Sequence, residues 1–202
     1  QRNDTGSFTL NGGNSVVNKD TAPKQNWFDY TYWSSPVVNE TAENAFALTP
    51  ANRRFYFEGQ NFIDIGNDID DNGDDWQLAS GVLIPGVGYA ATSFNVGSFP
   101  RVDQNNFNGA FNNGIIDVPV YRNAANPVAS NNWNFIGNPY PSAIDFVELF
   151  NQNSGAIEGS AYLWSQSQPP LASNPGNENL NFSQNDYAII NAGSGNVAGG
   201  AI

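Results

Sequence analysis

Residues 65–76, IGNDIDDNGDDW, place five aspartates within eight positions and end on a tryptophan. Asp68, Asp70 and Asn72 stand at the first, third and fifth positions of a D-x-D-x-N-G pattern, whose glycine lets a chain wrap around an ion. Calcium takes roughly six to eight oxygen ligands, mostly carboxylates and carbonyls. The spacing therefore predicts a calcium-binding loop, with ligands drawn from Asp64, Asp68, Asp70, Asn72, Asp74 and Asp75.

A solvated turn is the alternative interpretation of this acidic loop. Ala79 stands where an EF-hand has its bidentate glutamate, and the neighbouring residues predict strands instead of helices. Asn72 and Gly73 would then simply make the bend. Repulsion among the carboxylates favours a bound cation, whereas the turn needs none, so both interpretations stay open at this point.

The composition narrows the classes of function. The 202 residues carry 19 acidic and 7 basic side chains, for a formal charge of −12, and contain no Cys, His or Met. Without a basic run, nucleic acid and anionic membranes are poor partners, because nothing would neutralise their phosphates. No stretch approaches the roughly 20 apolar residues that cross a bilayer.

Catalytic constellations are also missing from the sequence. Without His or Cys, the usual general base and the thiol nucleophile are absent, and no P-loop or dinucleotide fingerprint occurs. Carboxylates are plentiful, but the sequence does not place two of them across a cleft. We therefore expect a protein that is not an enzyme.

Short alternating segments dominate the chain. Period-2 patterns predict strands near residues 27–33, 53–59, 132–137, 161–165 and 186–191, and a hairpin over 107–122 with its turn at Asn113-Gly114. One helix is predicted near 142–150, with Ser142 as its N-cap. The pattern indicates an all-β chain, an antiparallel β-sandwich of the jelly-roll or immunoglobulin kind.

The domain organisation follows from the same pattern. Residues 1–19 are predicted to form an edge strand or a linker from an upstream region. Residues 20–202 are predicted to form a single sandwich module, truncated at its C-terminal end, where the sequence becomes small and Gly-rich.

Exposed aromatic side chains are the second candidate for chemistry. Carbohydrate-binding sandwiches hold sugar rings on Trp or Tyr faces, with Asn, Asp and Gln binding the hydroxyl groups. Trp27 and Trp33 fall on one face of their predicted strand, and Trp76 follows the acidic loop. These three are the predicted glycan contacts, with Trp76 preferred, and burial in the core is the alternative for each.

Six segments of the chain are familiar as a set. They are DYTYWSSPV (29–37), PANRRFYF (50–57), IPGVGYAA (84–91), NNGIIDVPV (112–120), NWNFIGNPYPSAID (132–145) and SQNDYAIIN (183–191). Over residues 20–195 the chain resembles a β-rich module of large secreted and cell-surface proteins of Bacteroidetes, particularly flavobacteria, which the type IX secretion system exports. In that family further strands follow the Asn-Asp-Tyr segment.

The resemblance implies an extracellular or cell-surface location and a role in adhesion, and it supplies no catalytic residues. It also implies an O-glycosylation site, because Asp20-Thr21-Ala22 matches the short pattern used in Bacteroidetes. An ordinary threonine in a turn is the alternative for Thr21.

The sequence as a whole predicts a non-catalytic surface module with a structural or adhesive role, stiffened by calcium at the acidic loop. Its expected partners are glycans, neighbouring surface modules or copies of itself. Two alternatives stay open. One is a carbohydrate-binding module of a secreted polysaccharide-degrading protein, and the other is a filament subunit completed by strand exchange.

Overall fold

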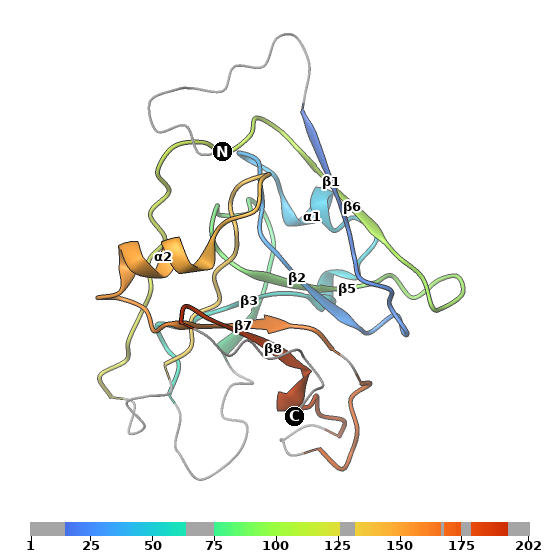
Figure 1. The fold of residues 1–202 in the computed structure, drawn as a ribbon. Helices are drawn as coiled ribbons and strands as arrows, with labels where there is room; N and C mark the ends of the chain where they lie inside the picture. Colours follow the sequence, from blue (N-terminus) through green and yellow to red (C-terminus); the bar gives the residue numbers. More distant parts are fainter. Residues whose placement is uncertain (1–14, 64–74, 126–131, 167, 175–178, 194–202) are drawn as a thin grey trace. The chain divides into compact units, whose positions relative to one another are not determined.

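The structure of the chain is a computed structural model, which describes residues 15–63, 75–125, 132–166, 168–174 and 179–193 (Figure 1). The chain divides into two compact units. Unit 1 comprises residues 1–58, 76–119 and 134–143, and unit 2 comprises residues 59–75, 120–133 and 144–202. Each unit is thus built from three separate stretches of sequence.

Unit 1 contains two antiparallel sheets. Strand β1 (Val16–Asp20) pairs with β6 (Gln104–Asn108), so that Val17 lies opposite Phe107. The second sheet has the order β2-β5-β3-β4. Its strands are β2 (Tyr30–Trp33), β5 (Tyr89–Thr92), β3 (Arg54–Phe57) and β4 (Trp76–Leu78).

The core of unit 1 joins the two sheets through aromatic side chains. The ring of Trp33 in β2 lies 6.1 Å from that of Phe107 in β6 and 6.3 Å from that of Phe46, between ring centroids. Phe46 ends the short helix α1 (Ala42–Ala45), which Thr41 caps by accepting a hydrogen bond from the backbone nitrogen of Asn44. Burial of these large side chains is the main stabilising term for this unit.

Backbone segments outside the strands complete unit 1. The 3-10 helix η1 (Ala51–Arg53) leads into β3. The Arg54 guanidinium, which is buried, donates twice to the carbonyl oxygen of Thr49, at 3.0 and 2.6 Å. Arg54 therefore fixes the turn between α1 and β3.

The described part of unit 2 contains an α-helix, a short 3-10 helix and a two-stranded sheet. The helix α2 (Phe146–Asn153) precedes β7 (Ser160–Trp164), which pairs antiparallel with β8 (Tyr187–Asn191) directly after the 3-10 helix η3 (Gln184–Asp186). The predicted cap of the helix was wrong. Asp145, not Ser142, accepts from the backbone nitrogens of Val147 and Glu148, so the helix begins three residues later than Ser142 would place it.

The chain is all-β, as the alternating pattern predicts, and its strands pair antiparallel. The described strands form three separate sheets, and the jelly-roll or immunoglobulin sandwich stays a prediction. Strand β1 runs across the boundary at residues 19 and 20 that separates the two predicted regions. Among the described residues, no helix has the length and apolar character that a membrane span requires.

The hairpin predicted over residues 107–122 is wrong. Phe111 makes an isolated bridge to Val37, and no strand follows it in residues 112–122. The backbone nitrogen of Asn112 donates to Pro36, and its side-chain amide donates to the carbonyl oxygens of Ser35 and Pro139, at 2.9 Å each. These contacts hold residues 111 and 112 beside residues 35–37.

Candidate binding surfaces

Most of the predicted calcium loop lies outside the described residues, namely Asp64, Asp68, Asp70, Asn72 and Asp74. Asp75 is described, and it is buried directly before β4. Within the described part of the chain, no three or more acidic, His or Cys side chains come together in a way that could hold a metal ion. Calcium binding by the loop stays a prediction.

Of the predicted glycan contacts, the prediction for Trp33 is wrong. Only 6% of its surface is exposed, because its ring packs among Phe46 and Phe107 in the core of unit 1. Both faces of β2 carry aromatic side chains, and alternation alone does not tell which face the core covers.

Trp76 and Trp27 are half-buried, and neighbouring side chains pack against their rings. Trp76 lies 5.4 Å from Phe57 and 5.6 Å from Phe135, between ring centroids. The Arg53 guanidinium stands 5.4 Å from the centroid of the Trp27 ring, as in a cation–π contact. Both rings are therefore less exposed than we expected for a glycan contact.

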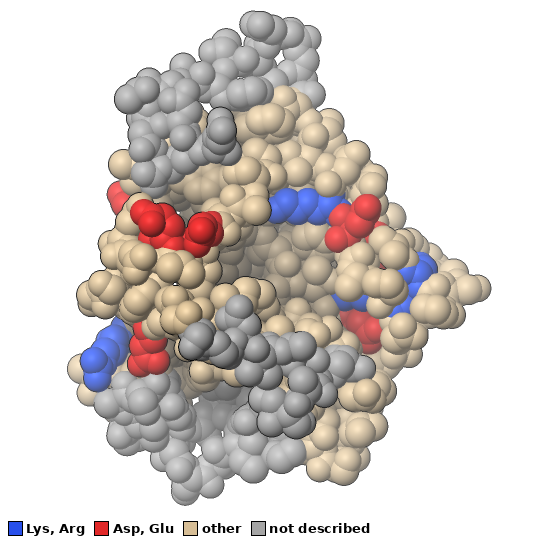
Figure 2. Space-filling view, in the orientation of Figure 1, with Lys and Arg blue, Asp and Glu red and all other residues tan. Residues whose placement is uncertain are grey.

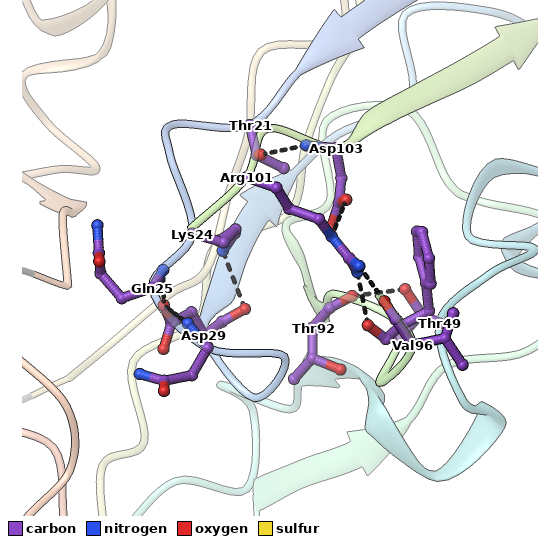
Figure 3. Close-up of polar contacts among 11 residues, drawn as sticks. Thr21, Lys24, Gln25, Asp29, Thr49, Thr92, Val96, Arg101 and Asp103 are labelled. Carbon is purple, nitrogen blue, oxygen red and sulfur yellow. Dashed lines mark hydrogen bonds and ion pairs between the residues drawn. The ribbon is translucent and has the colours of Figure 1, made fainter. Parts of the chain in front are cut away.

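Thr21, the predicted glycosylation site, is 8% exposed, so the prediction that it is exposed is wrong. Its hydroxyl oxygen accepts a hydrogen bond from the backbone nitrogen of Asp103 at 3.0 Å (Figure 3). The backbone nitrogen of Thr21 donates in turn to the carbonyl oxygen of Asp103 at 2.9 Å. This reciprocal pair extends the contact of β1 with β6 and encloses the hydroxyl group.

The most exposed aromatic pair lies instead in unit 2. Trp133 is 44% exposed and Tyr162 is 45% exposed, and their rings meet edge to face with centroids 5.1 Å apart. Tyr162 belongs to β7, whereas Trp133 precedes a stretch of unit 1 in the sequence.

The register of β7 and β8 places further residues beside this pair. Residues directly opposite each other in an antiparallel pair share one face of the sheet, as do alternate residues of each strand. The face that carries Tyr162 therefore consists of Ser160, Tyr162 and Trp164 from β7 and of Asn191, Ile189 and Tyr187 from β8. With Trp133, we call these seven residues the aromatic face of unit 2.

Ring contacts continue along the aromatic face. The Tyr187 ring lies 6.4 Å from that of Tyr162 and 5.1 Å from that of Trp164. At the other end of the face, the Ser160 hydroxyl donates to the side-chain oxygen of Asn191 at 2.6 Å. The face thus combines aromatic rings with hydroxyl and amide groups, and none of its residues is charged.

This combination suits an uncharged, hydroxyl-rich ligand, because aromatic rings pack against apolar C–H surfaces while hydroxyl and amide groups form hydrogen bonds. Figure 2 shows that most of the described surface on the side it presents is uncharged. The sequence contained one usable signal, the alternation of Tyr162 and Trp164. No feature of the sequence predicted that Trp133, from a separate segment, would contact Tyr162.

A small cavity is the second feature, and it lies in unit 1. Its volume is about 10 Å³, which is room for roughly one water molecule. Five separate segments of the chain line it. The lining residues are Thr21, Lys24, Thr31, Trp33, Leu48, Thr49, Ala91, Thr92, Ser93, Phe94, Asp103, Gln104 and Asn105. We call it the polar cavity.

Unpartnered polar atoms gather at the polar cavity. Among the described residues, Trp33 Nε1, Thr92 Oγ1, Ser93 Oγ and Asp103 Oδ2 are buried without a hydrogen-bond partner, and all four residues line it. A buried polar atom without a partner costs about 1–3 kcal/mol. Because residues that line one cavity carry four such atoms, a small polar group bound there is a candidate partner for them.

Arg101 contacts Asp103, one of the residues that line the polar cavity (Figure 3). Its guanidinium donates to Asp103 Oδ1 at 2.7 Å and to the carbonyl oxygens of Phe94 and Val96, and it lies over the rings of Phe94 and Phe99. Because Arg101 engages only one carboxylate oxygen of Asp103, the other oxygen remains for the cavity.

Lys24 also lines the polar cavity. Its ammonium group donates to the carbonyl oxygen of Asp29 at 2.9 Å, and its backbone pairs with that of Arg101. Burial lowers the pKa of Lys24 from 10.5 to about 8, although the nearby carboxylates of Asp29 and Asp103 act to raise it. The cavity wall therefore holds an ammonium group that loses its proton under mildly alkaline conditions.

Comparison with known proteins gives a family match. A family model described as "Domain of unknown function (DUF8693)" matches residues 1–201. No curated protein and no solved structure matches the chain.

Proposed function

Since the chain belongs to the DUF8693 family, whose description names no activity, we propose its function from its own residues. It is a non-catalytic adhesive module of the cell surface or the extracellular space, and it contacts neutral glycans through the aromatic face of unit 2. This proposal joins the surface role predicted from the sequence with the carbohydrate-binding alternative.

One observation carries the proposal: Trp133 and Tyr162 are both nearly half exposed, and they stand in contact on a face without charged residues. A large aromatic ring that gives up burial loses hydrophobic stabilisation, unless a ligand covers it. Pyranose rings offer the C–H surface for such cover, and their hydroxyl groups match Ser160 and Asn191.

Binding without cleavage follows from the chemistry of the same residues. Glycosidases place two carboxylates about 5–9 Å apart across the scissile bond. The aromatic face contains no carboxylate, so a bound glycan would meet rings, hydroxyl groups and amides. The resemblance to secreted Bacteroidetes modules supports the surface location.

A titration of the full chain with neutral oligosaccharides, such as cello-, xylo- and chito-oligosaccharides, tests the proposal. Tryptophan fluorescence and calorimetry would report saturable binding. Trp133→Ala and Tyr162→Ala are each expected to weaken the affinity at least about tenfold, which corresponds to about 1.4 kcal/mol. Trp27→Ala is the matched control, because it removes a half-buried tryptophan of unit 1 and leaves the aromatic face intact.

Two results would contradict the proposal. One is a chain that binds none of the neutral oligosaccharides. The other is a folded Trp133→Ala variant that binds them as tightly as the unaltered chain does, because the aromatic face would then not be the site.

Self-association by strand addition is the second candidate function. Within the described residues, β7 and β8 form a sheet of only two strands, and such a sheet presents edges to which another strand can add. Sedimentation at increasing concentration would show growth into larger species if copies of the chain pair in this way. A chain that stays monomeric at high micromolar concentration would argue against it.

A further inference from the structure

The polar cavity of unit 1 offers hydrogen-bonding groups of both kinds. Trp33 Nε1 only donates, and Asp103 Oδ2 accepts. The hydroxyl groups of Thr92 and Ser93 do either. A group that satisfies this set must itself both donate and accept.

The charges around the cavity balance one another. Lys24 and Arg101 bring two positive charges, and Asp29 and Asp103 bring two negative charges. An anion entering the cavity would leave Asp103 Oδ2 without a donor and would be repelled by it. A cation would leave the indole N–H of Trp33 without an acceptor, so neither kind of ion fits the whole set.

The rim of the cavity is apolar and reaches solvent. Leu48 is 63% exposed, Phe94 is half-buried, and both line the cavity beside the exposed Gln104. A ligand whose hydroxyl group enters the cavity would lay its carbon skeleton against Leu48 and Phe94. The volume of about 10 Å³ admits one hydroxyl-sized group and no more.

We propose that the polar cavity is a binding site for one terminal hydroxyl group of a neutral polyol or sugar. That group accepts from Trp33 and donates to Asp103, and its second lone pair accepts from the hydroxyl group of either Thr92 or Ser93. The site belongs to unit 1 and is separate from the aromatic face of unit 2.

Nuclear magnetic resonance of the full chain labelled with ¹⁵N tests this site directly. The five tryptophans give five indole N–H signals, and Trp33→Phe identifies the one from the cavity. The probes are glycerol, methyl α-D-glucopyranoside, sodium acetate and methylammonium chloride. We expect a saturable shift of the Trp33 signal with at least one of the two neutral probes and with neither ion.

A matched pair of serines provides the control. Ser93 and Ser34 are both 4% exposed, and the hydroxyl group of each lacks a partner among the described residues, but only Ser93 lines the cavity. Ser93→Ala is expected to lower the affinity for the neutral probe at least about tenfold, whereas Ser34→Ala leaves that affinity unchanged. Asp103→Asn, which replaces the accepting oxygen by a donor, serves as a second variant if Ser93→Ala does not fold.

Several results would overturn the site. No saturable shift with any probe would mean that the cavity holds water alone. A shift with acetate or methylammonium only would mean that the ligand is an ion. Movement of the Trp133 signal without the Trp33 signal would place the sugar on the aromatic face, which upholds the proposed function and rejects the cavity.

Discussion

The buried carboxylate of Glu40 accepts a hydrogen bond from the backbone nitrogen of Asn108, 68 residues further along the chain. Its other oxygen accepts from the backbone nitrogen of Thr41 at 2.9 Å. One side chain thus ties the start of α1 to the end of β6. Both oxygens of this buried carboxylate are thus occupied by backbone donors, and such charge-assisted hydrogen bonds are stronger than neutral ones.

Glu40→Gln is expected to destabilise the chain by about 1–3 kcal/mol. The amide has one accepting oxygen, so one of the two backbone N–H groups would face an NH₂ group and lose its acceptor. Urea unfolding followed by fluorescence measures the change. Glu43→Gln is the matched control, since its carboxylate also accepts from a backbone nitrogen, that of Gly81, but at the surface. Equal effects of the two substitutions would contradict a special role for the buried carboxylate.

Lys24 makes stability depend on pH in a defined window. Burial lowers its folded pKa to about 8 from 10.5, so between these values the unfolded chain carries a proton that the folded chain has lost. Stability therefore rises with pH across this window, by at most about 3 kcal/mol. Unfolding curves of the unaltered chain and of Lys24→Met, recorded from pH 7 to pH 10.5, should show the difference between the two changing across the window. A constant difference would contradict the lowered pKa.

Asn112 joins two segments that are distant in sequence, because its amide donates to Ser35 and to Pro139. Asn112→Ala leaves two buried carbonyl groups without this donor, and we expect a loss of about 2–4 kcal/mol. Asn106→Ala in β6 is the control, since Asn106 is exposed. The loss would show as a lower denaturation midpoint with an unchanged urea dependence, and equal midpoints for the two variants would refute it.

Calcium binding by residues 64–75 is tested by thermal unfolding in a chelator and then in millimolar calcium. A ligand that binds only the folded chain raises its stability by about 2.7 kcal/mol at a hundredfold excess over the dissociation constant. We expect a higher midpoint with calcium, and its loss when Asp68 and Asp70 are replaced by Asn. An unchanged midpoint would favour the solvated turn.

Local patterns predicted the strands well and the supporting contacts poorly. Strands β2, β3 and β8 lie within segments where alternation predicted them, and β7 overlaps its segment, because period-2 side chains fit a pleated backbone. The strand predicted at residues 132–137 is wrong, since those residues form no strand. The hairpin at residues 107–122 failed because Asn113-Gly114 is only a local turn signal. Side-chain contacts of Asn112 with distant segments decided the path of the chain instead.

The two candidate binding surfaces differ in how far sequence could anticipate them. Tyr162 and Trp164 alternate on one strand, so an aromatic face was visible in outline. The polar cavity takes its lining from five segments, and none of them shows a motif. Trp33, predicted as exposed, is buried because the sheet of β1 and β6 covers its side of β2 through Phe107.

The burial and the contacts of the Lys and Arg side chains decide where proteases of trypsin specificity would cut this protein. Such enzymes must draw an extended segment around Lys or Arg into their cleft, which requires local opening of the chain. Lys24 and Arg54 are buried, and Arg101 is held by Phe94, Val96 and Asp103. Arg122 is exposed and lies outside every strand and helix, so among the described basic residues it is the expected first point of cleavage. Limited digestion should therefore nick unit 2 while the segments that enclose the polar cavity stay whole.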